Sequence, residues 1–311
     1  MMIELAEVET NASRPQSVAR SIHLSIADIK IALKSTDPRM TLGVTGAANR
    51  FLTEEAASDA TLSAAWALLE DKDLGQPLFD SGSLWKLYRG ADDGFTLRFA
   101  TPYLGERPYK LARFNHDFTE GEVLLHRPFF AAEHEAFPLE YPLDELWLLN
   151  LLARGRGVEL HCSGVKDERG RGLLFVGQSG AGKTTMSRLW EKERGVEILS
   201  DDRIVLRRRE DGQYFMYGTP WHGEAELSSP ESAPLSAIFF LRHGERNHLR
   251  DLNRAEASAR LFSCSFPTYY DAAGLDFTLQ FFEALTGAVP CRELSFVPER
   301  EALDLLFNFG F

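Results

Sequence analysis

Cysteine and positive charge are both scarce in this chain. Only three cysteines, Cys162, Cys264 and Cys291, occur among 311 residues, and their wide spacing excludes a disulfide framework or a thiolate metal motif. We expect buried, reduced thiols, the usual state in a cytoplasmic protein. Lysine and arginine number 34 against 46 acidic residues, so the net charge of −12 excludes an overall attraction to nucleic acid or to an anionic membrane.

Long apolar runs are also missing. The longest run, residues 146–153, is interrupted by Asn150 and is far shorter than the roughly 20 residues that a bilayer span needs. Residues 1–15 carry acids early and lack the cationic and apolar regions of a signal peptide. With 44% hydrophobic and 26% charged residues, the chain has a globular composition and enough length for two domains, and we expect it in the cytoplasm.

Residues 1–142 are predicted to form an N-terminal, mainly antiparallel β domain. Segments with alternating apolar and polar residues flank turns at residues 90–94 and 120–121, a pattern typical of a half-solvated antiparallel sheet. Residues 53–71 are rich in Ala, Leu and Glu and are expected to be helical. No pattern in this part indicates a chemical activity, so its role is left open.

A buried helix is predicted to open the second domain, residues 143–311. Pro142 has the place of a first-turn proline, and Asp144 and Glu145 follow it, where acids favour a helix N-terminus. Gly155 is positioned to end this helix. We predict an α/β fold for the second domain, and α+β for the chain as a whole.

The segment LLFVGQSGAGKTTMSRLW, residues 173–190, contains the most specific motif of the chain. It has the Walker A spacing G-x-x-x-x-G-K-[ST] and lies between a short apolar strand and a helix, the context that a P-loop requires. In this motif backbone N–H groups and a helix N-terminus bind phosphate, the lysine reaches the β- and γ-phosphates, and the hydroxyl binds Mg²⁺. The predicted nucleotide-binding residues are Gly177, Gln178, Ser179, Gly180, Ala181, Gly182, Lys183, Thr184 and Thr185.

Two adjacent carboxylates end the next predicted strand, VEILSDD. Asp201 and Asp202 follow an apolar segment, where their charge needs a cation or hydrogen bonds to compensate it. Close to a phosphate loop, the pair suits a division in which Asp201 orients the Mg²⁺ shell and Asp202 takes a proton from an attacking hydroxyl. The alternative is a strand-end turn in which Asp202 contacts Arg203 or a nearby backbone N–H.

His161 is placed near the loop by the register of a predicted hairpin. If residues 158–165 and 173–176 pair around a turn centred near Arg169, His161 faces Gly177. There it could touch phosphate or orient an acidic residue, although a lone histidine is commonly structural.

Two later segments bear on the site and on the sheet. GTPWHGE, with Trp221 and His222, could line an acceptor pocket or form a packed turn with the tryptophan as its plug. The link Asp211-Gly212 is typical of an antiparallel hairpin, so the sheet is predicted to be mixed, unlike the doubly wound parallel sheet of ordinary P-loop enzymes.

Together, the motifs LHCSGV, GQSGAGKTT and LSDD resemble the kinase domain of the HPr kinase/phosphorylase family, over roughly residues 158–311. The resemblance implies a mixed-sheet P-loop kinase domain of the phosphoenolpyruvate carboxykinase type, with ATP and Mg²⁺. It implies catalytic roles for His161, Lys183 and Asp202. Thr184 matches the Mg²⁺-binding hydroxyl position, where the family usually has serine. The second metal carboxylate, with Glu224 as the nearest candidate, and the catalytic arginine of the family have no clear counterpart.

The expected function is an ATP-dependent phosphotransferase that acts on a hydroxyl, with a serine of a protein or peptide as the acceptor. A small-molecule hydroxyl kinase is one alternative. The other is a non-catalytic ATP-sensing module whose N-terminal domain binds a partner. The acceptor, the nucleotide preference, the reverse reaction and the oligomeric state are left open, and no nucleic-acid or membrane partner is expected.

Overall fold

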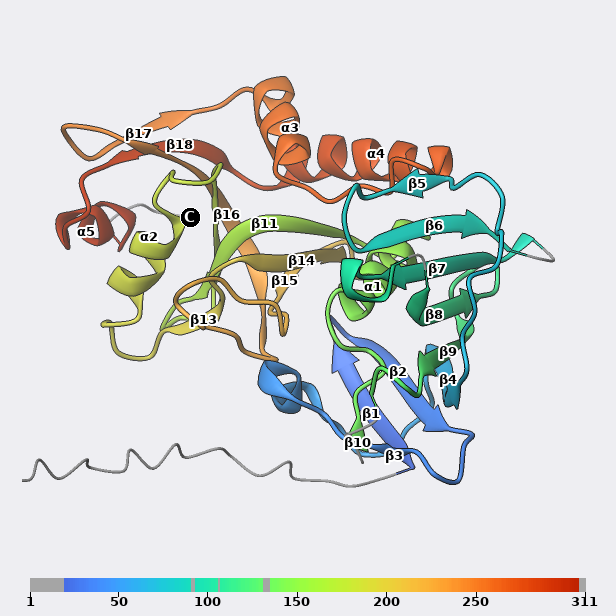
Figure 1. The fold of residues 1–311 in the computed structure, drawn as a ribbon. Helices are drawn as coiled ribbons and strands as arrows, with labels where there is room; N and C mark the ends of the chain where they lie inside the picture. Colours follow the sequence, from blue (N-terminus) through green and yellow to red (C-terminus); the bar gives the residue numbers. More distant parts are fainter. Residues whose placement is uncertain (1–19, 91–92, 106, 131–134, 308–311) are drawn as a thin grey trace, which may run out of the picture.

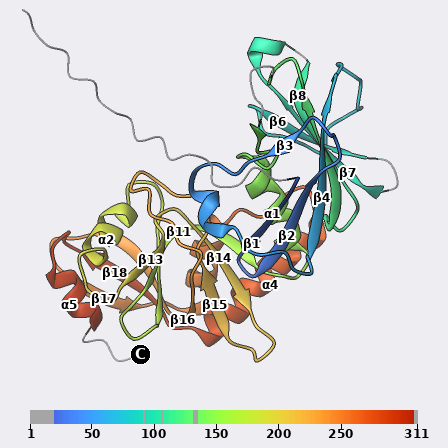
Figure 2. The same ribbon diagram turned by 90° about the horizontal axis from the view of Figure 1, so that it is seen from below.

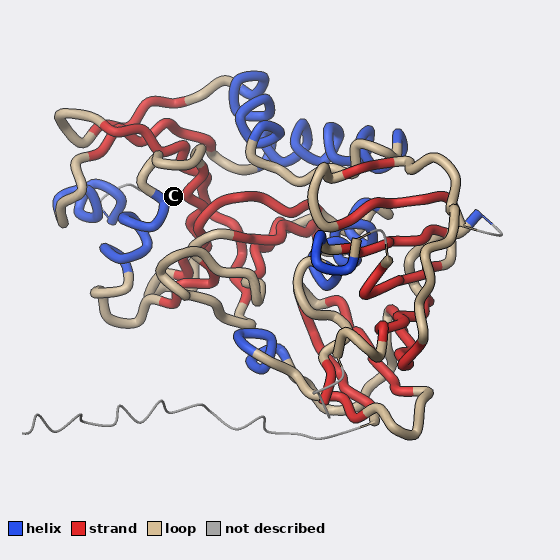
Figure 3. The backbone as a smooth tube through the Cα atoms, in the orientation of Figure 1, coloured by secondary structure: helices blue, strands red, loops and turns tan. Residues whose placement is uncertain are grey.

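The computed structural model describes residues 20–90, 93–105, 107–130 and 135–307. Two eight-stranded sheets form the framework of this part of the chain, and most helices lie around the second of them (Figures 1 and 3). Both large sheets are mixed, which confirms an α+β fold. None of the helices in the described ranges is long and apolar enough to cross a membrane.

The first sheet has the strand order β1-β2-β4-β9-β8-β7-β6-β5. Its neighbours pair antiparallel except β2–β4 and β4–β9, so the prediction of a mainly antiparallel N-terminal sheet is confirmed. The described residues of this part also contain a parallel pair of β3 with β10 and the short 3-10 helices η1 and η3. The bounds are β1 Ser21–Ile26, β2 Ile29–Ser35, β3 Thr41–Leu42, η1 Gly46–Phe51, β4 Ala60–Ala67, β5 Phe79–Asp80, β6 Trp85–Arg89, β7 Phe95–Ala100, η3 Pro102–Leu104, β8 Pro108–Phe114, β9 Glu120–His126 and β10 Glu135–Ala136.

The prediction of a helix within residues 53–71 is wrong. Strand β4 occupies Ala60–Ala67, and its buried residues, among them Leu62 and Trp66, alternate with more exposed ones. This strand lies inside the sheet, between β2 and β9. Burial of every second side chain between two neighbouring strands outweighs the modest helix preference of alanine and leucine.

The second sheet has the order β12-β11-β14-β15-β16-β18-β17, and β12 also pairs with β16, which closes part of the sheet into a ring. Parallel pairs β12–β16 and β16–β18 combine with antiparallel ones, so the predicted mixed sheet is confirmed. The bounds are β11 Val158–Lys166, β12 Gly172–Val176, β13 Glu197–Ser200 (paired with β11), β14 Arg203–Arg208, β15 Tyr214–Tyr217, β16 Ser232–His243, β17 His248–Asp251 and β18 Cys291–Phe296.

Helices cover both faces of the second sheet (Figure 1). Leu173 and Phe175 of β12 pack into one core with α2 (Lys183–Trp190) and α5 (Glu301–Phe307). Leu174 and Val176 of the same strand pack into the other core with α3 (Arg254–Ser263) and α4 (Ala272–Ala288). The alternating side chains of one short strand thus tie the P-loop helix to the rest of the sheet.

Helix α1 (Leu143–Ala153) lies between the two large sheets (Figure 2). It begins directly after Pro142, which was expected in its first turn and is instead its N-cap, and Gly155 follows its end, as predicted, with a φ of 84°. Its apolar residues belong to the core of the first sheet, and Trp147 Nε1 donates a hydrogen bond to Phe118 O at 2.7 Å. The division of the chain at residue 142 stays a prediction, because the helix after it packs into the first core.

Candidate functional site

The P-loop connects β12 to α2 with a strongly curved backbone. Gly180 and Gly182 have φ values of 81° and 101°, in the left-handed region that glycine adopts without strain. A Cβ atom at Gly177 would lie 2.6 Å from the Cβ of Ala181, so only glycine fits there. The ring nitrogen Nε2 of His243 lies 2.7 Å from Gly180 O and holds the loop from β16. Local backbone geometry therefore suits a phosphate-binding loop.

Beside the loop lies an open hollow of about 400 Å³, within the usual size range of ligand pockets. The first half of the loop forms one wall. Phe240 and Leu241 of β16 and Arg260, Ser263 and Cys264 of α3 and its end form the others. Arg260 is held there by Glu256 and Glu293.

Lys183 begins α2 and folds back over the loop. Its Nζ donates to the carbonyl oxygens of Gly177 and Gln178 at 2.8 and 3.3 Å. Burial lowers the pKa of Lys183, and the negative charge of nearby Asp202 opposes that change. A phosphate in the loop would offer this ammonium a stronger, charged acceptor than the two carbonyls. Thr184, half-buried, and Thr185, exposed, follow in the first turn of the helix.

His161 and Asp202 form a pair beside the loop. The hairpin register is as predicted, since Cys162 pairs with Val176, and His161 is one residue further toward the loop. Its Nε2 lies 3.0 Å from Asp202 Oδ1. Two roles were considered for His161, contact with phosphate and orientation of an acidic residue. The contact with Asp202 supports the second.

Asp202 is a carboxylate at neutral pH. Burial alone would raise its pKa, but the hydrogen bond from His161 and the charges of Arg203 and Lys183 lower the pKa overall. Its Oδ2 contacts Nη1 of Arg203, the partner expected for a strand-end turn. With one partner on each oxygen, the ionised group still has lone pairs that can accept a proton.

Asp201 is engaged elsewhere. It is buried, its Oδ1 accepts the backbone N–H of Gly223 at 2.9 Å, and its Oδ2 accepts that of Ala225 at 3.0 Å. These bonds anchor the loop after β15. The structure gives Asp201 an anchoring part, and its role in a metal shell stays a prediction. No group of three or more metal-ligating side chains occurs among residues 20–307 where the structure describes them.

The segment GTPWHGE was expected either to line an acceptor pocket or to form a packed turn, and its residues differ in which of these they fit. Trp221 is buried, and its Nε1 donates to Asp144 Oδ2 at 2.8 Å, so it plugs a packed turn. His222 and Glu224 are exposed on the same loop. Only these exposed residues remain available to a ligand.

Two residues beside the site, Glu145 and Glu159, were missed at the sequence level, and Arg203 was expected only as a turn contact of Asp202. Arg203 lies between Asp202 and two further carboxylates, Glu145 of α1 and Glu159 of β11. Arg203 had been considered only as part of a turn, and Glu145 only as a helix-start acid. No local signal marks Glu145 and Glu159 as part of the site, because both lie far from Arg203 in the chain and reach it through tertiary packing.

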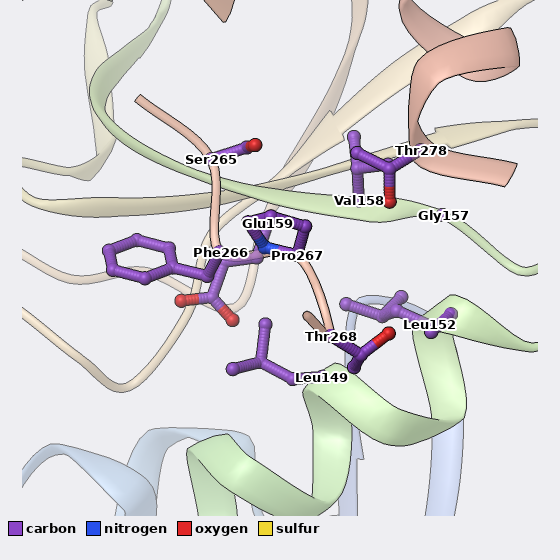
Figure 4. A pocket seen from close by; sticks show the side chains of 11 residues that line it. Leu149, Leu152, Gly157, Val158, Glu159, Ser265, Phe266, Pro267, Thr268 and Thr278 are labelled. Carbon is purple, nitrogen blue, oxygen red and sulfur yellow. The ribbon is translucent and has the colours of Figure 1, made fainter. Parts of the chain in front are cut away.

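Glu159 lines a small cavity of about 10 Å³, room for one water molecule (Figure 4). Neither of its carboxyl oxygens has a hydrogen-bond partner among the described groups, and the same is true of Thr268 Oγ1 in this cavity. Burial, followed by the negative charge of Glu145, raises the pKa of Glu159 well above its usual range. The charged form of Glu159 is therefore disfavoured in the folded chain.

Removing the ionisable group at Glu159 should change how stability depends on pH. The raised pKa means that the unfolded chain ionises first, so wild-type stability falls as pH rises above about 4.5, by up to about 1.4 kcal/mol per pH unit. Glu159→Gln cannot ionise, so its free energy of unfolding in urea should rise relative to that of wild type as the pH increases above about 4.5. Glu122→Gln, on an exposed strand position, is the control. Parallel pH curves for Glu159→Gln and wild type would contradict the assignment.

Asp201→Asn should destabilise the fold by about 1–3 kcal/mol, because the amide can accept only one of the two backbone N–H groups and leaves the other unsatisfied. Urea unfolding measures this loss, with the exposed Asp251→Asn as the control. A metal ligand behaves differently: phosphate transfer by the variant would then need a higher Mg²⁺ concentration while unfolding stays unchanged. That result would restore the metal role and contradict the anchoring role.

Comparison with known proteins adds little. No family model and no curated protein matches the chain. Among solved structures, it is similar to the Hpr(Ser) kinase/phosphatase from Coxiella burnetii, with 13% identity over 48% of this chain and 85% of that chain, at a TM-score of 0.28. A likeness at this level carries no argument about fold or activity.

Proposed function

We propose that the chain is an ATP-dependent kinase that transfers the γ-phosphoryl group to a hydroxyl, with a serine of a protein or peptide as the acceptor. The observation that carries this proposal is the His161–Asp202 pair, whose carboxylate acts electrostatically on Lys183 of the Walker A loop. A nucleotide-binding module needs the loop alone. Phosphate transfer to a hydroxyl also needs a proton acceptor, and Asp202 is a carboxylate whose charge acts on the lysine of the loop.

Each residue has a defined part in this reaction. Asp202 takes the proton of the acceptor hydroxyl as its oxygen bonds to the γ-phosphorus, and the bond from that phosphorus to the bridging oxygen of ADP breaks. Lys183 stabilises the negative charge on the transferring group, and His161 holds the Asp202 carboxylate in place. The backbone N–H groups of the loop and the start of α2 hold the other phosphates.

The residues present also fit Mg²⁺. The ion commonly takes only one or two protein oxygens besides phosphates and water, and the Thr184 hydroxyl in the first turn of α2 is such a group. Mg²⁺ held there would neutralise charge on the β- and γ-phosphates. Asp201 is the second candidate, through lone pairs that its two backbone donors leave free.

The exposure of the pair supports a macromolecular acceptor. The side chains of His161 and Asp202 are 32% and 24% exposed, so a serine presented by another chain can reach them. Small-molecule sites usually bury most of their ligand. The small-molecule kinase therefore stays the second candidate, and an ATP-sensing module the third.

The decisive test combines binding and transfer. Mg-ATP binding is measured by calorimetry, and γ-labelled ATP is supplied with candidate serine-containing proteins and peptides, then with small hydroxyl compounds. The proposal expects a labelled serine. Label in a small molecule alone would favour the second candidate. Tight binding without any labelled product would favour the sensing module.

A further inference from the structure

The guanidinium of Arg203 is surrounded by carboxyl groups. Its Nη1 contacts Asp202 Oδ2, and its Nε lies 2.8 Å from Glu145 Oε1 and 3.5 Å from Glu159 Oε1. The ring of Phe266 stacks below it, with the Cζ atom 4.4 Å from the ring centroid. Arg203 is thus held on several sides at once, and only 17% of its side chain is exposed.

These partners come from three separate elements. Glu145 stands in the first turn of α1, Glu159 on β11, and Asp202 in the turn after β13. The neighbouring Asp144 binds Trp221, on the same loop that Asp201 anchors. The first turn of α1 therefore touches both segments that border Asp202, although the apolar side of this helix belongs to the core of the first sheet.

We propose that Arg203 and Glu145 are positioning residues for Asp202. Glu145 fixes the guanidinium through Nε, and the guanidinium fixes Oδ2 of Asp202, which leaves Oδ1 to His161. The planar fork of arginine makes such a two-ended contact directional, whereas a lysine supplies only a point charge. This inference rests on the proposed kinase function, because it assigns residues to the orientation of its proton acceptor.

The division between Glu145 and Glu159 follows from their surroundings. The side chain of Glu159 is fully buried, and its Oε1 lies 3.5 Å from Arg203 Nε without forming a hydrogen bond. Glu145 makes the shorter contact and is the counter-ion on the α1 side. The other charged or titratable groups around this cluster are His161, Lys183, Cys162, Asp144 and Tyr141.

Two measurements on the full chain test the proposal. The first is release of phosphate from Mg-ATP with water as the acceptor, which needs no knowledge of the natural acceptor and separates kcat from KM. The second is the downfield ring N–H proton signal of His161 at a fixed pH, assigned by its loss in His161→Gln. This signal reports the His161–Asp202 contact even if no ATP is turned over.

We expect Arg203→Gln and Glu145→Gln to lower kcat by at least ~10-fold with the KM for Mg-ATP within about twofold of wild type, as for a group that acts in the transition state only. The His161 proton signal should shift or broaden in both. Arg203→Lys should recover part of kcat, and should fold if the glutamine variant does not. Arg113→Gln, which breaks the exposed pair with Glu122, is the matched control and should resemble wild type.

The outcomes separate the two claims. A wild-type chain that neither binds nor hydrolyses Mg-ATP contradicts the kinase function, and the His161 signal then still decides the positioning claim. An unchanged signal in Arg203→Gln or, in its place, Arg203→Lys overturns that claim, as does a wild-type kcat in Glu145→Gln. A lower kcat that comes with a proportionally weaker binding of Mg-ATP also overturns it, since a general loss of site structure would explain it.

Discussion

Asp202→Asn is expected to reduce phosphate transfer by at least ~10²-fold while Mg-ATP binds nearly normally. The amide has the size of the carboxylate and can still accept one hydrogen bond, from His161 or from Arg203. It cannot take the proton of the acceptor hydroxyl. Binding should hold, because the substitution removes a negative charge close to Lys183 and the phosphates.

Calorimetry for Mg-ATP and a labelled-phosphate assay measure the two effects of Asp202→Asn. Asp211→Asn, in the exposed hairpin turn, is the matched control and should transfer phosphate normally. Normal transfer by Asp202→Asn would mean that Asp202 has a structural part only and is not the proton acceptor of the reaction. Loss of Mg-ATP binding would instead indicate that Asp202 is a ligand of Mg²⁺. The metal role predicted for Asp201 would then belong to Asp202.

Lys183→Ala is expected to reduce transfer by at least ~10²-fold, because it removes the positive charge that acts on the transferring phosphoryl group. The fold should remain intact. The ammonium is buried, its pKa is lowered by that burial, and among the described residues it donates only to two carbonyls of its own loop, so its loss also removes a desolvation cost.

Thermal unfolding and the labelled-phosphate assay decide this prediction together. Lys166→Ala, on the neighbouring strand β11 and paired with Glu231 at the surface, controls for loss of a lysine in the same sheet. An unchanged transfer rate in a folded Lys183→Ala would remove the lysine from the reaction. A collapsed fold would show that the lysine is structural, contrary to the contacts described.

Short-range patterns predicted their parts of the molecule well. The P-loop, its strand and the start of α2 at Lys183 follow from one motif, because every group in it lies within a few residues of the others. The same holds for the β11–β12 hairpin, whose register placed His161 beside Gly177. Both rest on local backbone geometry that neighbouring residues determine.

Helix propensity gave a wrong prediction for a strand that lies inside a sheet. The segment that became β4 has the alanine and leucine content of a helix, yet its alternate residues are buried between β2 and β9. The strands that pair with a segment can lie far away from it in the chain. The composition of the segment itself does not show which strands these are.

The division of work between the two aspartates also depended on tertiary contacts. Adjacent carboxylates look equivalent in sequence, but Asp201 points to the backbone of residues 223–225 and Asp202 to His161 and Arg203. Successive side chains at the end of a strand face different surroundings, so the partners of each carboxylate could not be assigned before the loop was placed.

By itself, the sequence determined a globular α+β chain with a Walker A loop, a histidine opposite its first glycine and an acid pair on the next strand. These features need only local geometry and the hairpin register. Only the tertiary structure decided that Glu145 of α1 reaches Arg203 and that Trp221 is a plug held by Asp144. Those contacts join residues that are 58 and 77 positions apart in the chain. They form because the apolar residues of α1 pack into the core of the first sheet, which places the first turn of this helix against the second sheet.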